Sequence, residues 1–158
     1  MSIPTTIDYV GSFERTLDDK GRLTLPSAWR SEHDEATRFM AVVIHGYVAV
    51  LTPDEVTRVR GRIREISFAD KAKQAAVNEF FSKAQVFSFD KAGRVLLDPA
   101  IREKAGIKDQ STVHLVGALT KFSIFSPEAL KRNQALAADL TAQIPETAED
   151  KILQLLGI

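Results

Sequence analysis

With 44% hydrophobic and 27% charged residues, the 158-residue chain has the composition of a globular protein, which excludes a disordered chain, and its length allows one compact unit rather than two large independent domains. Because 21 Lys and Arg balance 21 Asp and Glu, no global field draws the chain to nucleic acid or to an anionic membrane, so any DNA binding must come from local basic patches, alone or repeated by oligomerisation. The absence of cysteine excludes disulfides, thiolate zinc sites and cysteine nucleophiles, and fits a reducing cytoplasm.

The N-terminal segment, MSIPTTIDYVG, has neither the basic start nor the apolar run of a signal peptide. Nowhere does the sequence approach the ~20 apolar residues that a membrane-spanning helix needs. We therefore expect a cytoplasmic protein that does not bind a membrane.

The first elements in chain order are two short strands, at about 12–17 and 22–25, on either side of a tight turn. Together with their counterparts at 84–89 and 94–97, these strands contain the β-branched and aromatic residues typical of strands. Within the turn, the side chain of Asp18 can accept hydrogen bonds from backbone N–H groups, and Gly21 supplies the positive φ that reverses the chain. This pattern predicts a β-hairpin.

A short helical segment, two apolar strands and a long helix follow in the first half. The first three are expected over 27–30, 39–45 and 47–51. The long helix has a strong start signal, because Thr52 can serve as N-cap, Pro53 fits the first helical position and Glu55 completes a capping box. A further helix over about 67–82 is expected to link the two halves.

The second half repeats the first at an offset of 72 residues. The matching pairs are Asp18 and Asp90, Gly21 and Gly93, Arg22 and Arg94, and Arg30 and Arg102. The expected elements recur in the same order: strands at 84–89 and 94–97, a helix at 99–104, strands at 113–117 and 122–125, and a helix that begins at Ser126-Pro127-Glu128. This duplicated unit predicts an α+β fold. The tail is broken at Pro145 and ends in an apolar stretch, 152–158, that either docks or stays mobile.

From about Tyr9 to Lys131, the chain resembles the MraZ family of bacterial regulators. The resemblance rests on two spaced copies of Asp-x-x-x-Arg, each with glycine before the arginine, and on their flanks. The residues that carry it are Gly11, Leu17, Asp18, Lys20, Gly21, Arg22, Pro26 and Arg30 in the first copy, and Asp90, Gly93, Arg94, Arg102, Gly106, Leu115, Val116 and Gly117 in the second. The second turn departs from the first in having Ala92 at the position of Lys20.

The resemblance implies two tandem AbrB-like swapped-hairpin halves that form a pseudo-twofold β-barrel core with peripheral helices. It divides the chain into a first AbrB-like repeat at 9–56, linking helices at 57–82, a second repeat at 83–131 and a C-terminal helical tail at 132–158. It also implies a ring-shaped homo-oligomer that binds short direct repeats in double-stranded promoter DNA. These repeats would lie upstream of the division and cell-wall gene cluster, so the protein is expected to regulate transcription at the nucleoid.

The motif suggests how such a protein contacts DNA. The candidate DNA-binding residues are Lys20, Arg22, Lys91 and Arg94, and the candidate motif-orienting residues are Asp18, Gly21, Asp90 and Gly93. A lysine on the turn offers a point charge for phosphate, whereas an arginine offers a planar fork that matches the O6 and N7 atoms of guanine. Our hypothesis is that the arginines read bases while the lysines mainly hold phosphate. The aspartates are expected to orient the turns and the glycines to bend them.

The same residues fit a plainer interpretation, in which each turn is closed by a surface Asp–Arg salt bridge worth about 0–1 kcal/mol. The densest basic cluster, Arg58 to Arg64, is expected to be a solvated helix flank or an intersubunit salt-bridge face, with a secondary DNA surface as the alternative. Trp29 is expected to anchor the core.

No sequence motif indicates catalysis. The G-x-S-x-G, P-loop, G-x-G-x-x-G and H-E-x-x-H patterns are absent, and His33, His45 and His114 lack metal-ligand spacing. We therefore expect no enzyme, no cofactor and no metal site, although a buried carboxylate pair in a cleft would instead indicate a hydrolase. Two other functions stay open: an AbrB-like antitoxin or transition-state regulator, in which a single copy usually dimerises, and a structural ring whose turns bind protein partners.

Overall fold

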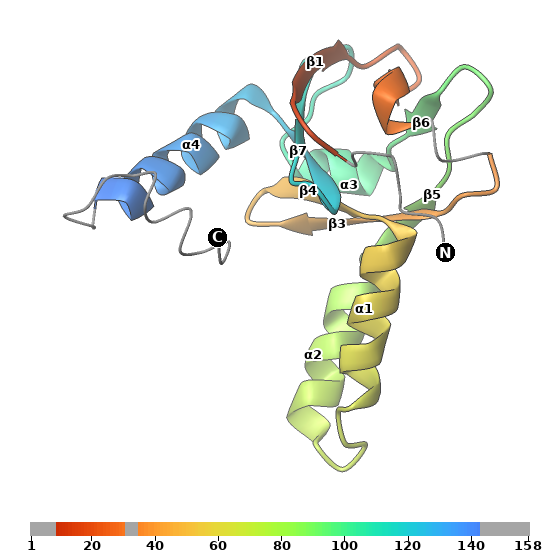
Figure 1. The fold of residues 1–158 in the computed structure, drawn as a ribbon, viewed down its shortest axis with the longest axis vertical. Helices are drawn as coiled ribbons and strands as arrows, with labels where there is room; N and C mark the ends of the chain where they lie inside the picture. The colour runs from red at the N-terminus through yellow and green to blue at the C-terminus, as the bar shows by residue number, and fades with distance from the viewer. Residues whose placement is uncertain (1–8, 31–34, 143–158) are drawn as a thin grey trace, which may run out of the picture.

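The computed structural model describes residues 9–30 and 35–142 and confirms the predicted α+β class (Figure 1). The elements of the first half are β1 (Ser12–Thr16), β2 (Arg22–Thr24), the 3-10 helix η1 (Ser27–Trp29), β3 (Phe39–Ile44), β4 (Tyr47–Leu51), α1 (Pro53–Arg64) and α2 (Lys71–Phe81). Those of the second half are β5 (Gln85–Phe87), β6 (Arg94–Leu96), α3 (Pro99–Lys104), β7 (Thr112–Gly117), β8 (Lys121–Phe125) and α4 (Pro127–Ala142). His33 and the part of the predicted tail after residue 142 lie outside the described residues.

The two halves exchange strands throughout the molecule. Six strands form one antiparallel sheet in the order β1-β7-β8-β4-β3-β5, while β2 and β6 pair as a separate ribbon, which we call the β2–β6 ribbon. In the sheet, β1 of the first half pairs with β7, and β5 of the second half pairs with β3. At the centre, β4 and β8 pair with each other. Each of these pairings has its counterpart when the two halves are exchanged, so neither half forms its sheet alone.

Two expectations about the strands are wrong. The predicted hairpins, β1 with β2 and β5 with β6, do not form. Instead β1 pairs with β7, β5 pairs with β3, and β2 and β6 pair with each other. A turn signal reverses the chain locally, but the strand partners follow from the burial of apolar faces between the halves. The predicted β-barrel is not closed: among residues 9–30 and 35–142, β1 and β5 are edges of the sheet, and Asp18 and Asp90 bond within the turns that separate these edges from the ribbon.

One apolar core joins the sheet, the ribbon and η1. Phe39 and Phe122 are at most 1% exposed, and their ring centroids lie 6.2 Å apart. The ring of Trp29 lies 5.0 Å from that of Phe122, which confirms the prediction that this tryptophan anchors the core. Leu23 and Val95, the middle residues of the two ribbon strands, belong to the same cluster. Because side chains alternate between the two faces of a strand, the burial of these middle residues means that their neighbours along each strand point away from the core.

Local capping signals set the starts of the helices. The hydroxyl of Thr52 accepts the backbone N–H of Glu55 at 3.4 Å, so α1 begins where the sequence predicts. The helix predicted over 67–82 begins later, at Lys71, because the side chain of Asp70 caps it there. In both helices the cap side chain satisfies an N–H group that has no partner within the helix.

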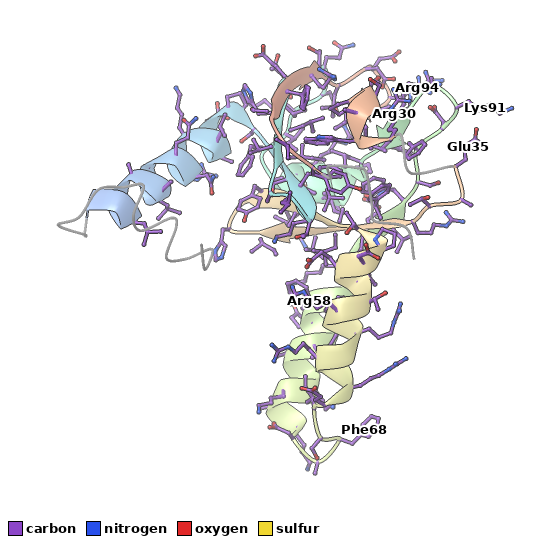
Figure 2. The ribbon with its side chains drawn as sticks, in the orientation of Figure 1. Arg30, Glu35, Arg58, Phe68, Lys91 and Arg94 are labelled. Carbon is purple, nitrogen blue, oxygen red and sulfur yellow. The ribbon has the colours of Figure 1, made fainter. Side chains whose placement is uncertain are left out.

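Two helical projections leave the strand body (Figure 1). The connection between α1 and α2 lies far from the strands and carries Phe68, which is 93% exposed (Figure 2). On α4, which projects in a different direction, Leu136 and Leu140 are 64% and 48% exposed. Within the part of the chain that the structure describes, no helix is both long and apolar enough to cross a membrane.

Candidate nucleic-acid interface

The carboxylate of Asp18 closes the first turn. Its Oδ1 accepts the backbone N–H groups of Lys20 and Arg22, both at 2.9 Å, and its Oδ2 accepts the guanidinium Nε–H of Arg22 at 2.7 Å. The backbone N–H of Gly21 donates to the carbonyl of Asp18 at 3.1 Å, and the φ of Gly21 is +79°. Most L side chains avoid this φ, so glycine is the residue that the turn requires. Asp18 thus sets both the turn and the direction of the Arg22 side chain.

Asp90 closes the second turn with the same set of hydrogen bonds. Its Oδ1 accepts the N–H groups of Ala92 and Arg94 at 3.0 and 2.9 Å, and its Oδ2 accepts the Nε–H of Arg94 at 2.9 Å. The N–H of Gly93, whose φ is +78°, donates to the carbonyl of Asp90 at 2.9 Å. The two turns therefore have equivalent geometry, although they lie 72 residues apart in the sequence.

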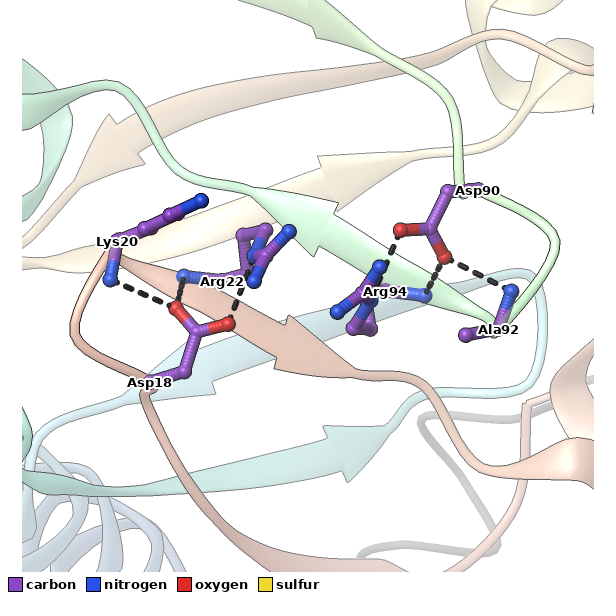
Figure 3. Close-up of polar contacts among 6 residues, drawn as sticks. All are labelled: Asp18, Lys20, Arg22, Asp90, Ala92 and Arg94. Carbon is purple, nitrogen blue, oxygen red and sulfur yellow. Dashed lines mark hydrogen bonds and ion pairs between the residues drawn. The ribbon is translucent and has the colours of Figure 1, made fainter.

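The turns lie at opposite ends of the β2–β6 ribbon, and their arginines share its outer face. Arg22 pairs with Leu96 and Thr24 with Arg94, so these four side chains occupy the face opposite the buried middle residues. Figure 3 shows the two arginines between the two aspartates. The side chains of Arg22 and Arg94 are 27% and 39% exposed. Next to them on the ribbon, Leu96 is 52% exposed, an unusual exposure for a large apolar side chain.

The two turn lysines are exposed but occupy different positions. Lys20 is the residue whose N–H bonds the first aspartate, and Ala92 holds that position in the second turn. Lys91 precedes Ala92 and extends away from the body (Figure 2). The structure thus brings Arg22 and Arg94 together on one face and places a lysine near each end of the ribbon.

Two further arginines lie against the turns, and each comes from the half of the chain that does not contain the turn it contacts. A Cβ added to Gly21 would lie 2.7 Å from Cζ of Arg102, and one added to Gly93 would lie 2.3 Å from Cζ of Arg30. The sequence aligns these arginines at the same offset as the motif but does not indicate their position. Contact across the halves follows only from the strand exchange, which is why the sequence by itself indicates no role for them.

One member of the Arg58–Arg64 cluster is engaged in an ion pair on its own helix. Arg58 donates to Oε2 of Glu55 from Nη2 at 2.8 Å and from Nε at 3.3 Å. These bonds hold the pKa of the Glu55 carboxyl below its ordinary value, although burial of the carboxyl opposes them. Only one half of the expected capping box forms. The Thr52 hydroxyl accepts the backbone N–H of Glu55, whereas the Glu55 carboxylate accepts from Arg58. This pairing favours a salt-bridged helix flank at Arg58.

No metal centre is evident at the turns. In residues 9–30 and 35–142, no group of three or more His, Asp or Glu side chains is arranged to hold a metal ion. The charged groups at the candidate interface include the Asp–Arg pairs, the turn lysines, and Arg30 and Arg102, whose guanidinium groups lie against the turn glycines. Such an arrangement can bind anions through its cations and can hold an arginine fork in a fixed direction.

The Asp–Arg contacts predict a titration in the acid range. Hydrogen bonds from the backbone amide and the guanidinium of Arg22 hold the pKa of Asp18 below its ordinary value, and Arg94 does the same for Asp90, while burial opposes both. A lowered carboxyl pKa stabilises the turn above the ordinary aspartate pKa, and this stabilisation is lost as pH falls through the lowered value. In an NMR titration of the carboxyl carbons, Arg22→Ala should raise the pKa of Asp18 part of the way and leave that of Asp90 in place. Equal movement of both would contradict two independent turns.

Comparison with known proteins gives a consistent set of relatives. No family model matches the chain. The chain is 34% identical over 137 residues to the transcriptional regulator MraZ of Thermomicrobium roseum, and the aligned region covers 85% of this chain and 89% of that protein. Identity is 32% over 143 residues with the transcriptional regulator MraZ of Desulforamulus reducens, covering 90% of this chain and 98% of that protein. The protein of the same name from Caldicellulosiruptor saccharolyticus is 30% identical over 129 residues, covering 80% and 86%.

Proposed function

Because the chain belongs to the MraZ family of transcriptional regulators, we propose that it binds double-stranded promoter DNA sequence-specifically through the outer face of its β2–β6 ribbon. One observation carries the proposal. Two equivalent Asp–Arg turns lie at opposite ends of one ribbon, and Arg22 and Arg94 emerge from the same exposed face. This face is therefore the proposed region of contact with DNA.

The two-stranded form and the chemistry of the ribbon suit the major groove. A two-stranded β-ribbon fits into the major groove of B-DNA, and an arginine fork can bond O6 and N7 of guanine. The Nε–H groups of Arg22 and Arg94 are bonded to aspartates in the free protein, so each guanidinium plane is oriented before DNA arrives. Preorganisation of this kind lowers the entropy cost of binding. The surface ion pair of the plainer interpretation is therefore compatible with base reading.

We assign the turn lysines to phosphate. Lys20 and Lys91 lie near opposite ends of the ribbon and are exposed, so a ribbon in the groove would bring them towards the two flanking backbones. Phosphate contacts fix the register of a protein on DNA, whereas base contacts specify the sequence. Asp18 and Asp90 then serve as orienting residues, and Gly21 and Gly93 as the bends.

We further propose a ring-shaped homo-oligomer that engages direct repeats upstream of the division and cell-wall gene cluster. Within each chain, the repeats at 9–56 and 83–131 would form one swapped-hairpin unit, which the strand exchange between the halves supports. A chain of zero net charge offers few DNA contacts, but several copies on repeated sites can raise the apparent affinity by ~10²–10⁴. The exposed Phe68 and Leu136 on the two helical projections offer apolar surface for contact between copies.

A competition gel shift tests the proposed function. The full-length protein is bound to labelled DNA from upstream of the division and cell-wall gene cluster, at one fixed salt concentration. Unlabelled native repeats should then compete at least ~10³-fold better than random duplex of the same length. Equal competition would exclude sequence-specific regulation and favour a ring that binds protein partners. Native mass measured with and without repeat DNA gives the stoichiometry, and a plain dimer would favour the antitoxin-like alternative.

The lysine assignment predicts a change in salt dependence. Lys20→Ala should make the plot of log affinity against log salt shallower by ~0.9 for each phosphate that Lys20 neutralises, with little change in sequence preference. The matched control is Lys83→Ala, which removes a lysine that follows α2 and pairs with Glu79 on that helix, and it should leave the slope unchanged. A Lys20→Ala protein that instead relaxes base preference would move this lysine from phosphate to base contact.

A further inference from the structure

Each DNA-proximal turn is covered by an arginine that the other half supplies. The guanidinium of Arg102 lies over Gly21, with Cζ and both Nη atoms within 3.0 Å of an added Cβ. The guanidinium of Arg30 lies over Gly93 in the same way, with Cζ, Nη1 and Nε within 2.6 Å. Both glycines are buried although both turns lie at the surface, and the opposing arginines account for their cover.

Each of these arginines is also bonded to the residue that directly follows the ribbon strand of its own half, and that residue in turn bonds the glycine of the other half's turn. Nε of Arg102 donates to the carbonyl of Leu97 at 3.2 Å, and the N–H of Leu97 donates to the carbonyl of Gly21 at 3.2 Å. In the other direction, Nε of Arg30 donates to the carbonyl of Leu25 at 3.1 Å, and the N–H of Leu25 donates to the carbonyl of Gly93 at 2.9 Å. Each turn is therefore held by a backbone hydrogen bond to the carbonyl of its glycine and covered by a planar guanidinium.

The surroundings of Arg102 differ from those of Arg22, the motif arginine next to Gly21. The side chain of Arg102 is only 13% exposed, and its Nη1 pairs with Asp109 while its Nε is bonded to Leu97. Arg22, the next residue after Gly21, is twice as exposed, at 27%. Gly21 is joined to Arg22 by one peptide bond, so a shift of Gly21 would displace the backbone N–H that Arg22 donates to Asp18. Arg102 thus contacts the neighbour of the proposed base-reading residue while its own side chain is mostly buried.

We propose that Arg102 and Arg30 are positioning residues that act across the two halves: Arg102 fixes the first turn and thereby Arg22, and Arg30 fixes the second turn and thereby Arg94. The inference rests on the proposed DNA-binding function of the ribbon. Its distinctive consequence is what we call crossed dependence: a residue in the second half affects the base contacts made by the first half, and a residue in the first half affects those made by the second.

A double-mutant cycle in the full-length protein tests this crossed dependence. Arg102→Ala alone should weaken binding of repeat DNA about tenfold, as expected for two coupled neighbours. In an Arg22→Ala background the added loss should shrink to less than about twofold, while in an Arg94→Ala background it should stay near tenfold. Equal added losses in both backgrounds would overturn the proposal and indicate that Arg102 contacts DNA or acts on the whole fold. Lys104→Ala, on the same helix, is the control for loss of charge.

Amide hydrogen exchange without DNA supplies the second readout. Arg102→Ala should speed exchange at Lys20, Gly21 and Arg22 and leave the second turn unchanged, and Arg30→Ala should do the reverse. Uniform acceleration in both turns would contradict a crossed positioning role. If Arg102→Ala fails to fold, Arg102→Lys carries both tests, because lysine keeps the stem and charge but lacks the planar fork. Failure of Arg22→Ala to affect DNA binding would refute the proposed function, while the exchange result would still judge the crossed contact.

Discussion

Arg22→Ala is expected to weaken binding of the native repeat by about 1–3 kcal/mol for each base pair that this arginine reads, and to relax preference at those positions. The expectation follows from the geometry of the first turn. Asp18 holds the Nε of Arg22 at 2.7 Å, so a single guanidinium is presented in one orientation from the outer face of the ribbon. Alanine removes the fork and leaves the turn itself, since the backbone bonds of Asp18 do not involve the arginine side chain. Affinity should be measured by titration against native and base-substituted repeats.

Arg64→Ala is the matched control for this substitution. It removes the same charge from the exposed end of α1, within the arginine cluster that offers the alternative DNA surface. Binding should fall for Arg22→Ala and stay near that of the unmodified protein for Arg64→Ala, with the native mass of both variants equal to that of the unmodified protein. Unchanged affinity in an assembled Arg22→Ala protein would remove the ribbon as the DNA site. A loss confined to Arg64→Ala would transfer the site to the helix.

Gly93→Ala is expected to destabilise the folded protein by roughly 2–3 kcal/mol. The left-handed backbone at φ +78° costs an L residue about 1–2 kcal/mol. The added Cβ would also lie 2.3 Å from Cζ of Arg30, so that guanidinium must leave its hydrogen bond to Leu25, a loss of about 1 kcal/mol. Urea unfolding at fixed protein concentration measures the change in the free energy of unfolding, and the concentration is matched because any association between copies would add to the apparent stability.

Gly61→Ala provides the opposite expectation for the same chemical change. Gly61 lies in α1 with no atom within 4 Å of an added Cβ, and alanine is the better helix former by about 0.8–1 kcal/mol. The two substitutions should therefore move stability in opposite directions. A Gly93→Ala protein as stable as the unmodified one would show that the turn can relax without cost, and would weaken the argument that Arg30 is held tightly over it.

The local features of the fold were predictable because they depend on neighbours in the sequence. Thr52 and Pro53 mark the start of α1 through capping chemistry that needs only three or four residues. Asp18 and Gly21 likewise indicate a tight turn, since the hydrogen bonds of the turn run between residues 18 and 22. Trp29 was predictable as a core residue because a large aromatic side chain on a short helix has little apolar surface to cover except the core.

The partners of the strands were not predictable from the same signals. A turn specifies that the chain reverses but not that β1 and β2 will pair, and here both strands pair with the other half instead. The barrel expectation failed for the same reason, because closure depends on which edges meet. Arg30 and Arg102 show this limit at the candidate site: the duplication made them equivalent, while their contact with the opposite turn depends on the exchange. Alignment of the halves combined with the strand pairing is what reveals it.

The two ends of the β2–β6 ribbon carry different side chains, so the ribbon has a direction. Lys20 at one end corresponds to Ala92 at the other, and Thr24 corresponds to the exposed Leu96. A symmetrical dimer must present identical ends and therefore matches palindromic DNA, whose two half-sites face each other. Two covalently joined halves are free to diverge, so a ribbon built from them can distinguish one reading direction of the double helix from the other. Sites repeated head to tail are the arrangement in which every subunit of an assembly can use that distinction in the same sense.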